Sequence, residues 1–160
     1  MDDLDGFRRF YDAHRREVGA AVALSLGDSQ LAAEAVDEAF VRAAERWPQV
    51  RSMDRPAGWV YRVAVNWAQS WRRKWSLRPT RPVEQLDRGQ HDVLPDPDLA
   101  AQLSRLPRLQ AQMLVLRFAL GCSVAETAEL LGVAQGTVKS GVHRARLQLR
   151  EYEEVRDGCR

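Results

Sequence analysis

The chain has 160 residues, of which 45% are hydrophobic, and a formal net charge of +2 at neutral pH. This length suits one medium domain or two small ones with packed cores. No stretch approaches the about 18 consecutive apolar residues that mark a membrane-spanning helix. The acidic start Met1-Asp2-Asp3 is also unlike a secretory signal. We therefore expect a cytoplasmic protein without membrane insertion.

Residue types that support catalysis or metal binding are scattered along the chain. Cys122 and Cys159 lie far apart, and His14, His91 and His143 have no metal-ligand spacing. The sequence contains no glycine-rich phosphate loop and no nucleophile with a plausible base. We expect no cofactor, no metal site and no enzymatic activity of the protein by itself.

The first part of the chain is predicted to begin with two helices. Apolar residues recur at three-to-four spacing over residues 4–26. Asp28 or Ser29 can cap a second helix, which ends near Trp47 because Pro48 stops it. One face of this second helix is acidic, which predicts a docking surface for a basic partner, with an ordinary solvated face as the alternative. The candidate docking residues are Glu34, Asp37, Glu38, Val41, Arg42 and Glu45.

A polar connector over residues 49–55 precedes a third helix from Pro56 to about Trp75. Residues 76–97 contain several prolines and an acidic run without periodicity, which predicts a flexible linker between two domains. Two short helices are then expected, over residues 99–105 and 107–120.

The segment from Ser123 to Arg150 has the pattern of a helix-turn-helix. Ser123 and Glu126 have capping-box spacing, and Gly132 permits a tight turn before a longer basic helix from Gln135. We predict a buried stripe of Val133, Val138, Val142, Ala145 and Leu149. The other face carries residue types that reach phosphates and base edges in duplex DNA: Gln135, Thr137, Lys139, Ser140, His143, Arg144 and Arg146. An ordinary helical hairpin with a solvated basic face is the alternative.

Basic residues are concentrated in two blocks, residues 55–82 and 133–150, and neither block contains an acid. This distribution predicts two separate contacts with a polyanion. In the third helix, tryptophans recur every four residues beside cations. This pattern is expected where the bases of a single-stranded nucleic acid stack on aromatic rings and cations follow its phosphate backbone. Core packing is the alternative for these rings. We favour core packing for Trp59 and Trp67, whereas core packing and base stacking are equally supported for Trp71 and Trp75.

These motifs resemble those of the extracytoplasmic-function sigma factors of the sigma-70 family. Gly132-Val-Ala-Gln-Gly-Thr-Val-Lys-Ser140, with His143-Arg-Ala-Arg146, is similar to region four, which reads the −35 promoter element and touches the β flap of RNA polymerase. Residues 28–40 resemble the region-two helix that docks on the β′ clamp helices. Trp59-Val-Tyr-Arg-Val-Ala-Val-Asn66 resembles the helix that melts and holds the −10 element. Ser70-Trp-Arg-Arg-Lys74 is similar to the actinobacterial SigE-like branch.

The resemblance implies an all-α fold of two small helical domains. Region two would cover residues 1–75 and region four residues 98–154, joined by the linker over residues 76–97. The partners implied are core RNA polymerase, promoter DNA and an anti-sigma factor. Residues expected at the single-stranded −10 element are Arg51, Ser52, Met53, Asp54, Arg55, Arg62, Asn66, Trp71, Arg72, Arg73 and Lys74.

One position in the recognition helix departs from the family pattern. Gly141 replaces a frequent arginine, so we expect it to remove a DNA contact and to cost about 0.5–1 kcal/mol of helix propensity.

Two other functions are left open by the residues themselves. A stand-alone helix-turn-helix regulator, with an N-terminal sensor or dimerisation domain, would bind paired half-sites without polymerase. A helical interaction protein, whose basic faces bind protein or RNA, would show no promoter preference.

Overall fold

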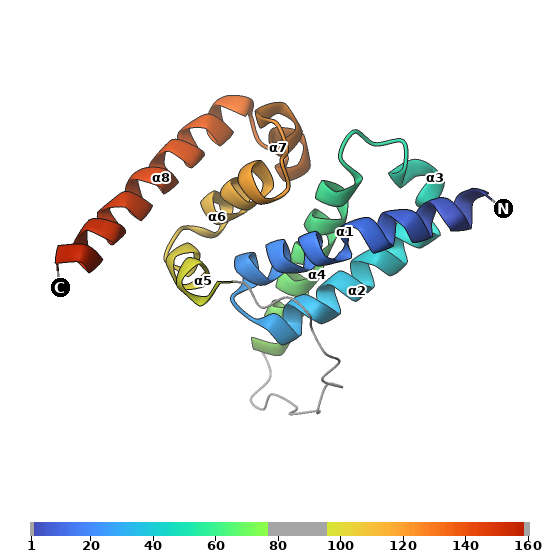
Figure 1. Ribbon diagram of the computed structural model, residues 1–160, viewed down its shortest axis with the longest axis horizontal. Helices are drawn as coiled ribbons and strands as arrows, with labels where there is room; N and C mark the ends of the chain where they lie inside the picture. Colours follow the sequence, from blue (N-terminus) through green and yellow to red (C-terminus); the bar gives the residue numbers. More distant parts are fainter. Residues whose placement is uncertain (1, 77–95, 159–160) are drawn as a thin grey trace.

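The computed structural model describes residues 2–76 and 96–158, and every regular element in these ranges is helical (Figure 1). The predicted all-α fold is thus confirmed, whereas the predicted linker lies almost wholly outside the described residues. None of the described helices combines the length and apolar character needed to cross a membrane. The first half of the described chain, residues 2–76, contains α1 (Asp2–Leu26), α2 (Ser29–Glu45), α3 (Trp47–Val50) and α4 (Pro56–Ser76). The second half, residues 96–158, contains α5 (Pro97–Ser104), α6 (Arg108–Leu114), η1 (Val115–Ala119), α7 (Val124–Leu131) and α8 (Gln135–Gly158).

Helices α1, α2 and α4 pack together and form the core of the first half. The side chain of Asp28 caps α2 by accepting a hydrogen bond from the Leu31 backbone N–H at 3.0 Å. On α4 the ring of Tyr61 is fully buried, and its hydroxyl lies 2.6 Å from Ser25 Oγ. The ring therefore contributes apolar area while its polar atom stays paired.

The end of α2 differs from the prediction. The helix ends at Glu45, and Pro48 lies in the first turn of the short helix α3 instead of simply stopping α2. A proline is tolerated there because the first N–H groups of a helix have no partner within it. Helix α3 buries Trp47, whose ring lies 5.6 Å from the Phe7 ring and 5.1 Å from the Phe10 ring between centroids.

The segment predicted as one α-helix over residues 107–120 is also different. Helix α6 passes at Val115 into the π-helical turn η1, where the Leu120 N–H donates to the Val115 carbonyl at 3.1 Å. Gly121 then adopts a left-handed φ of 66° and ends the segment.

The helix-turn-helix has the local geometry that the sequence predicts. The Glu126 N–H donates to Ser123 Oγ at 3.0 Å, and the Ser123 N–H donates to Glu126 Oε1 at 2.9 Å, which completes the capping box of α7. Gly132 ends α7 with a left-handed φ of 66°. Of the predicted apolar stripe, Val138 and Ala145 are fully buried, and the other members are partly buried.

The two halves pack directly against each other. Helix α1 lies against α5, α6 and η1, and α4 lies against α7 (Figure 1). Buried apolar side chains from both halves form one continuous cluster. The hydrophobic core is therefore shared between the segments on either side of the predicted linker.

Gly141 has a different role from the one expected from the sequence. It is buried in α8, and a Cβ at this position would run into the Met113 side chain on α6. The position faces the interior, so an arginine there would meet α6 rather than DNA. Gly141 allows α6 and α8 to approach closely, and the expectation of a lost DNA contact was wrong.

We predict that Gly141→Ala destabilises the protein although alanine is the better helix former. Overpacking against Met113 should lower the free energy of unfolding by about 1–3 kcal/mol in urea denaturation followed by circular dichroism. Gly136→Ala is the matched control, because it is on the same helix and nothing lies within 4 Å of its added Cβ. An equal effect of both substitutions would contradict the packing role of Gly141.

Candidate nucleic-acid interface

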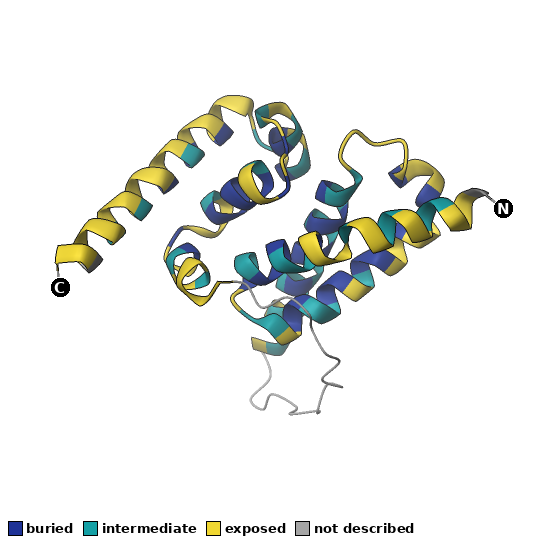
Figure 2. Cartoon of the chain, in the orientation of Figure 1, coloured by how far each residue is buried: buried dark blue, intermediate teal, exposed yellow. Residues whose placement is uncertain are grey.

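The outer face of α8 carries the residues predicted to contact duplex DNA. All seven are exposed, and Figure 2 shows an exposed outer surface along most of this helix. Val138 and Ala145 on the opposite side are fully buried, so the packing of α8 fixes which side faces outward. The Ser140 hydroxyl donates to the Thr137 carbonyl at 3.2 Å within the helix. This face can therefore offer amide, hydroxyl and cationic groups to a groove of duplex DNA.

Sequence reasoning missed Phe118 as part of this surface. The ring is 53% exposed, and the Arg146 guanidinium carbon lies 4.5 Å from its centroid. Arg117 also approaches the ring, at 5.5 Å, but its Nη1 donates to the Cys122 carbonyl at 2.6 Å and so holds the turn before α7. Stacking on Phe118 restrains Arg146 within the predicted DNA face. The available signal was an aromatic residue next to Arg117 at the end of the predicted helix over residues 107–120.

The connector between α3 and α4 contains five of the residues predicted for single-stranded DNA. All five, residues 51–55, are exposed. Arg51 Nη1 donates to Asp3 Oδ1 at 2.6 Å, and Ser52 donates to the Gln49 carbonyl at 2.7 Å. Arg55 Nε donates to Glu126 Oε2 on α7 at 3.0 Å. The connector is thus tied to α1 on one side and to the second half on the other.

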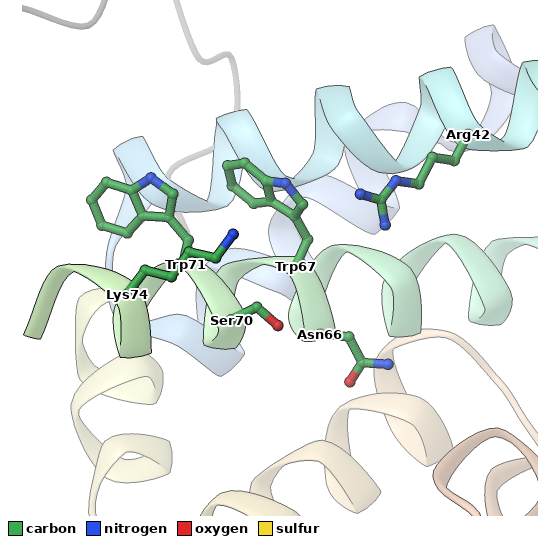
Figure 3. Close-up of a pocket in the computed structure, with 6 residues that line it drawn as sticks. All are labelled: Arg42, Asn66, Trp67, Ser70, Trp71 and Lys74. Carbon is green, nitrogen blue, oxygen red and sulfur yellow. The ribbon is translucent and has the colours of Figure 1, made fainter. Parts of the chain in front are cut away.

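A pocket of about 280 Å³ lies between α2 and α4. Figure 3 shows that Arg42 comes from α2 and extends toward Trp67, and that the other five lining residues all come from α4. Three of the lining residues, Asn66, Trp71 and Lys74, were predicted for the single strand. Arg42 was predicted for polymerase docking instead, whereas Trp67 and Ser70 were not in either predicted set. The pocket combines aromatic faces, cations and hydrogen-bonding groups, which are the elements of a single-strand site.

The other cations predicted on α4 are engaged within the protein. Arg62 Nη1 donates to Gln112 Oε1 on α6 at 3.1 Å, and Arg72 Nη2 donates to the Leu26 carbonyl at 2.7 Å. Arg73 donates to Ser70 Oγ at 3.3 Å. Arg72 therefore stabilises the end of α1, and Arg62 links the two halves.

The acidic face of α2 is open to solvent in the described structure. Asp37, Val41 and Glu45 are exposed, and Val41 is an apolar side chain with 54% exposure. Partial burial, followed by the nearby charges of Asp28 and Asp37, raises the pKa of Glu34 above its ordinary value. Such crowding of like charges favours a partner that brings positive charge.

The fold and these surfaces define a helix-turn-helix DNA-binding protein, and comparisons with known proteins specify its class. Residues 10–77 match the family model of sigma-70 region 2, and residues 98–149 match that of sigma-70 region 4. The chain is 32% identical over 157 residues to the ECF RNA polymerase sigma factor SigM of Mycobacterium tuberculosis, covering 92% of this chain and 76% of SigM. It is 34% identical to the RNA polymerase sigma-E factor of Streptomyces avermitilis, covering 79% and 73%.

A solved structure has the same fold. The sigma factor RpoE of Bartonella quintana, crystallised with the anti-sigma factor NepR, matches with a TM-score of 0.76 and 21% identity, covering 97% of this chain and 99% of that one.

The chain belongs to the extracytoplasmic-function (ECF) sigma factors of the sigma-70 family. It is a sigma factor that directs promoter-specific transcription initiation by RNA polymerase. The stand-alone regulator considered from the sequence is not favoured.

We predict that Lys74→Ala weakens binding of a single-stranded oligonucleotide. If Lys74 neutralises one phosphate at the pocket, the slope of log K against log salt should fall in magnitude by about 0.7, measured by fluorescence anisotropy. Arg9→Ala is the control, because Arg9 is an exposed cation of α1 that does not line the pocket. Equal slopes for wild type and Lys74→Ala would exclude this contact.

Proposed function

We propose that the two halves divide the work of promoter recognition. Residues 1–75 dock on core RNA polymerase and hold the −10 strand, and residues 98–154 read the −35 duplex, with residues 76–97 as the connection. The observation that carries the proposal is the outer face of α8. All seven side chains predicted to contact the DNA groove are exposed there, while Val138 and Ala145 on the opposite side of the helix are buried. On this proposal the protein has no enzymatic activity by itself and acts in the cytoplasm, where polymerase performs the chemistry.

The single-stranded part of the promoter is assigned to the first half. The connector over residues 51–55 and the pocket between α2 and α4 both contain predicted residues, and the pocket offers Trp67 and Trp71 for stacking and Lys74 for a phosphate. An extruded base costs a few kcal/mol of lost stacking, and a fitted pocket can offset that cost.

The polymerase-docking surface is assigned to the acidic face of α2. Asp37 and Glu45 provide exposed negative charge, and Val41 adds an exposed apolar side chain between them. An anti-sigma factor is a further proposed partner. Support comes from the sigma factor RpoE, which has the same fold and was crystallised with the anti-sigma factor NepR. CnrH, a second protein of this fold, was solved in complex with the cytosolic domain of CnrY.

The direct experiment combines purified core polymerase, this protein and a promoter library, and measures sequence-dependent transcripts. We predict that Lys139→Ala with Arg144→Ala lowers promoter-dependent transcription at least about 30-fold, because two side chains that each contribute about 1–3 kcal/mol of base reading together contribute at least about 2 kcal/mol. Core binding, measured by co-elution, should stay intact. Gln148→Ala, at an exposed α8 position outside the predicted set, should leave transcription unchanged. A parallel loss of core binding in the double variant would refute this division of labour.

The docking surface has its own test. Asp37→Lys with Glu45→Lys should weaken binding to core polymerase at least about tenfold, because like charges then face a basic partner. Both positions are exposed, and a lysine at position 45 suits the C-terminal end of α2, so folding should be preserved. Asp12→Lys places one new cation on exposed α1 and serves as the control. If the double variant bound core polymerase as well as wild type and Asp12→Lys do, docking would have to occur elsewhere.

A further inference from the structure

Phe118 is an aromatic residue that the packing of the second half of the chain leaves open to solvent. Leu116 and Leu120 on either side of it are buried, whereas the Phe118 side chain is 53% exposed. In a continuous α-helix Phe118 would lie on the same side as Leu114, which is four residues earlier and buried. The π-helical turn η1 adds a residue to the helical repeat at this point, and Phe118 is thereby turned away from the core.

Two guanidinium groups lie beside the Phe118 ring, and they are held in different ways. Arg117 is 5.5 Å from the ring centroid, but its Nη1 is already bonded to the Cys122 carbonyl. Arg146 is closer, at 4.5 Å, which is within the range of a cation–π contact. Among the residues that the structure describes, no acid or carbonyl accepts a hydrogen bond from Arg146. In this part of the chain the ring is therefore the group that restrains the Arg146 side chain.

A restraint of this kind leaves the hydrogen-bonding groups of Arg146 available. A guanidinium has five N–H donors, and an ion pair with an acid of the protein would occupy some of them. Contact with the face of a ring uses the positive charge and none of the donors, so a DNA phosphate can still accept two of them in a bidentate contact. A side chain that is ordered before it binds also loses less conformational freedom on binding.

We propose that Phe118 is a positioning residue for duplex DNA, which holds the Arg146 guanidinium ready to bind one phosphate of the backbone. The proposal rests on the function proposed above, and it assigns Arg146 to the phosphate backbone rather than to the base edges. Phe118 acts through Arg146 and makes no contact of its own with DNA. Removal of the ring should therefore lower the affinity for duplex DNA and leave the phosphate contact in place.

Phe118→Leu tests the proposal, because it removes the ring and keeps an apolar side chain at an exposed position where the fold should tolerate the change. Phe118→Tyr is the matched control, since it retains an aromatic ring. Arg146→Gln removes the cation, alone and together with Phe118→Leu. The measurement is fluorescence anisotropy of the full chain with a labelled duplex of about 20 base pairs and mixed sequence, over a range of salt concentrations, because a phosphate contact carries no sequence information.

We expect Phe118→Leu to weaken duplex binding about two- to fivefold at a fixed salt concentration, while the slope of log K against log salt stays that of wild type. Arg146→Gln should lower the magnitude of this slope by about 0.9, the value for one phosphate contact in duplex DNA. In the double variant, the leucine should cost no further affinity, because the residue through which Phe118 acts is gone. Phe118→Tyr should restore the affinity that Phe118→Leu loses.

The positioning role would be overturned if Phe118→Leu weakened binding equally in the wild-type and Arg146→Gln backgrounds, since the ring would then act independently. Wild-type affinity of Phe118→Leu, or a salt slope as shallow as that of Arg146→Gln, would overturn it as well. An unchanged slope in Arg146→Gln would contradict the phosphate contact. The proposed function fails separately, if Lys139→Ala with Arg144→Ala also left duplex binding unchanged, because the outer face of α8 would then not bind DNA.

Discussion

The burial of one side of α8 is the constraint on which the proposed duplex-reading surface depends. Val138, Gly141 and Ala145 follow each other at helical spacing, and all three are buried. Because Gly141 has no side chain, Met113 on α6 can occupy the space beside it, and this fixes the rotation of α8 about its axis. Lys139 and Arg144 are exposed as a direct consequence.

Glu126 connects this local architecture to the contact between the two halves. Its Oε1 accepts from the Ser123 N–H, and its Oε2 accepts from Arg55, so the cap and the ion pair use different oxygens. The Ser123 backbone N–H is the main reason that the pKa of Glu126 lies below its ordinary value, and Arg55 lowers it further. A partner or a strand that removes Arg55 thus leaves the start of α7 intact.

Local signals in the sequence were sufficient for most of the fold and for the outer face of α8. The Ser123–Glu126 capping box, the left-handed Gly132 and the helical spacing of apolar residues each depend on neighbours within about one or two turns. The orientation of Gly141, the π-helical turn after Leu114 and the pocket beside Arg42 depend on how distant helices pack. The Arg55–Glu126 contact joins residues 71 positions apart, which no local pattern could indicate.

The placement of charge explains why the net value of +2 says little about this protein. Exposed acids such as Asp37 and Glu45 on α2 and exposed cations such as Lys139 and Arg144 on α8 offset one another in the sum, yet they lie on different helices and face solvent. A polyanion is attracted to the α8 face and repelled by α2, whereas a basic protein surface has the opposite preference. The two faces can therefore select different partners at the same time. Their separation on the folded chain, rather than the overall charge, allows one small protein to contact both polymerase and DNA.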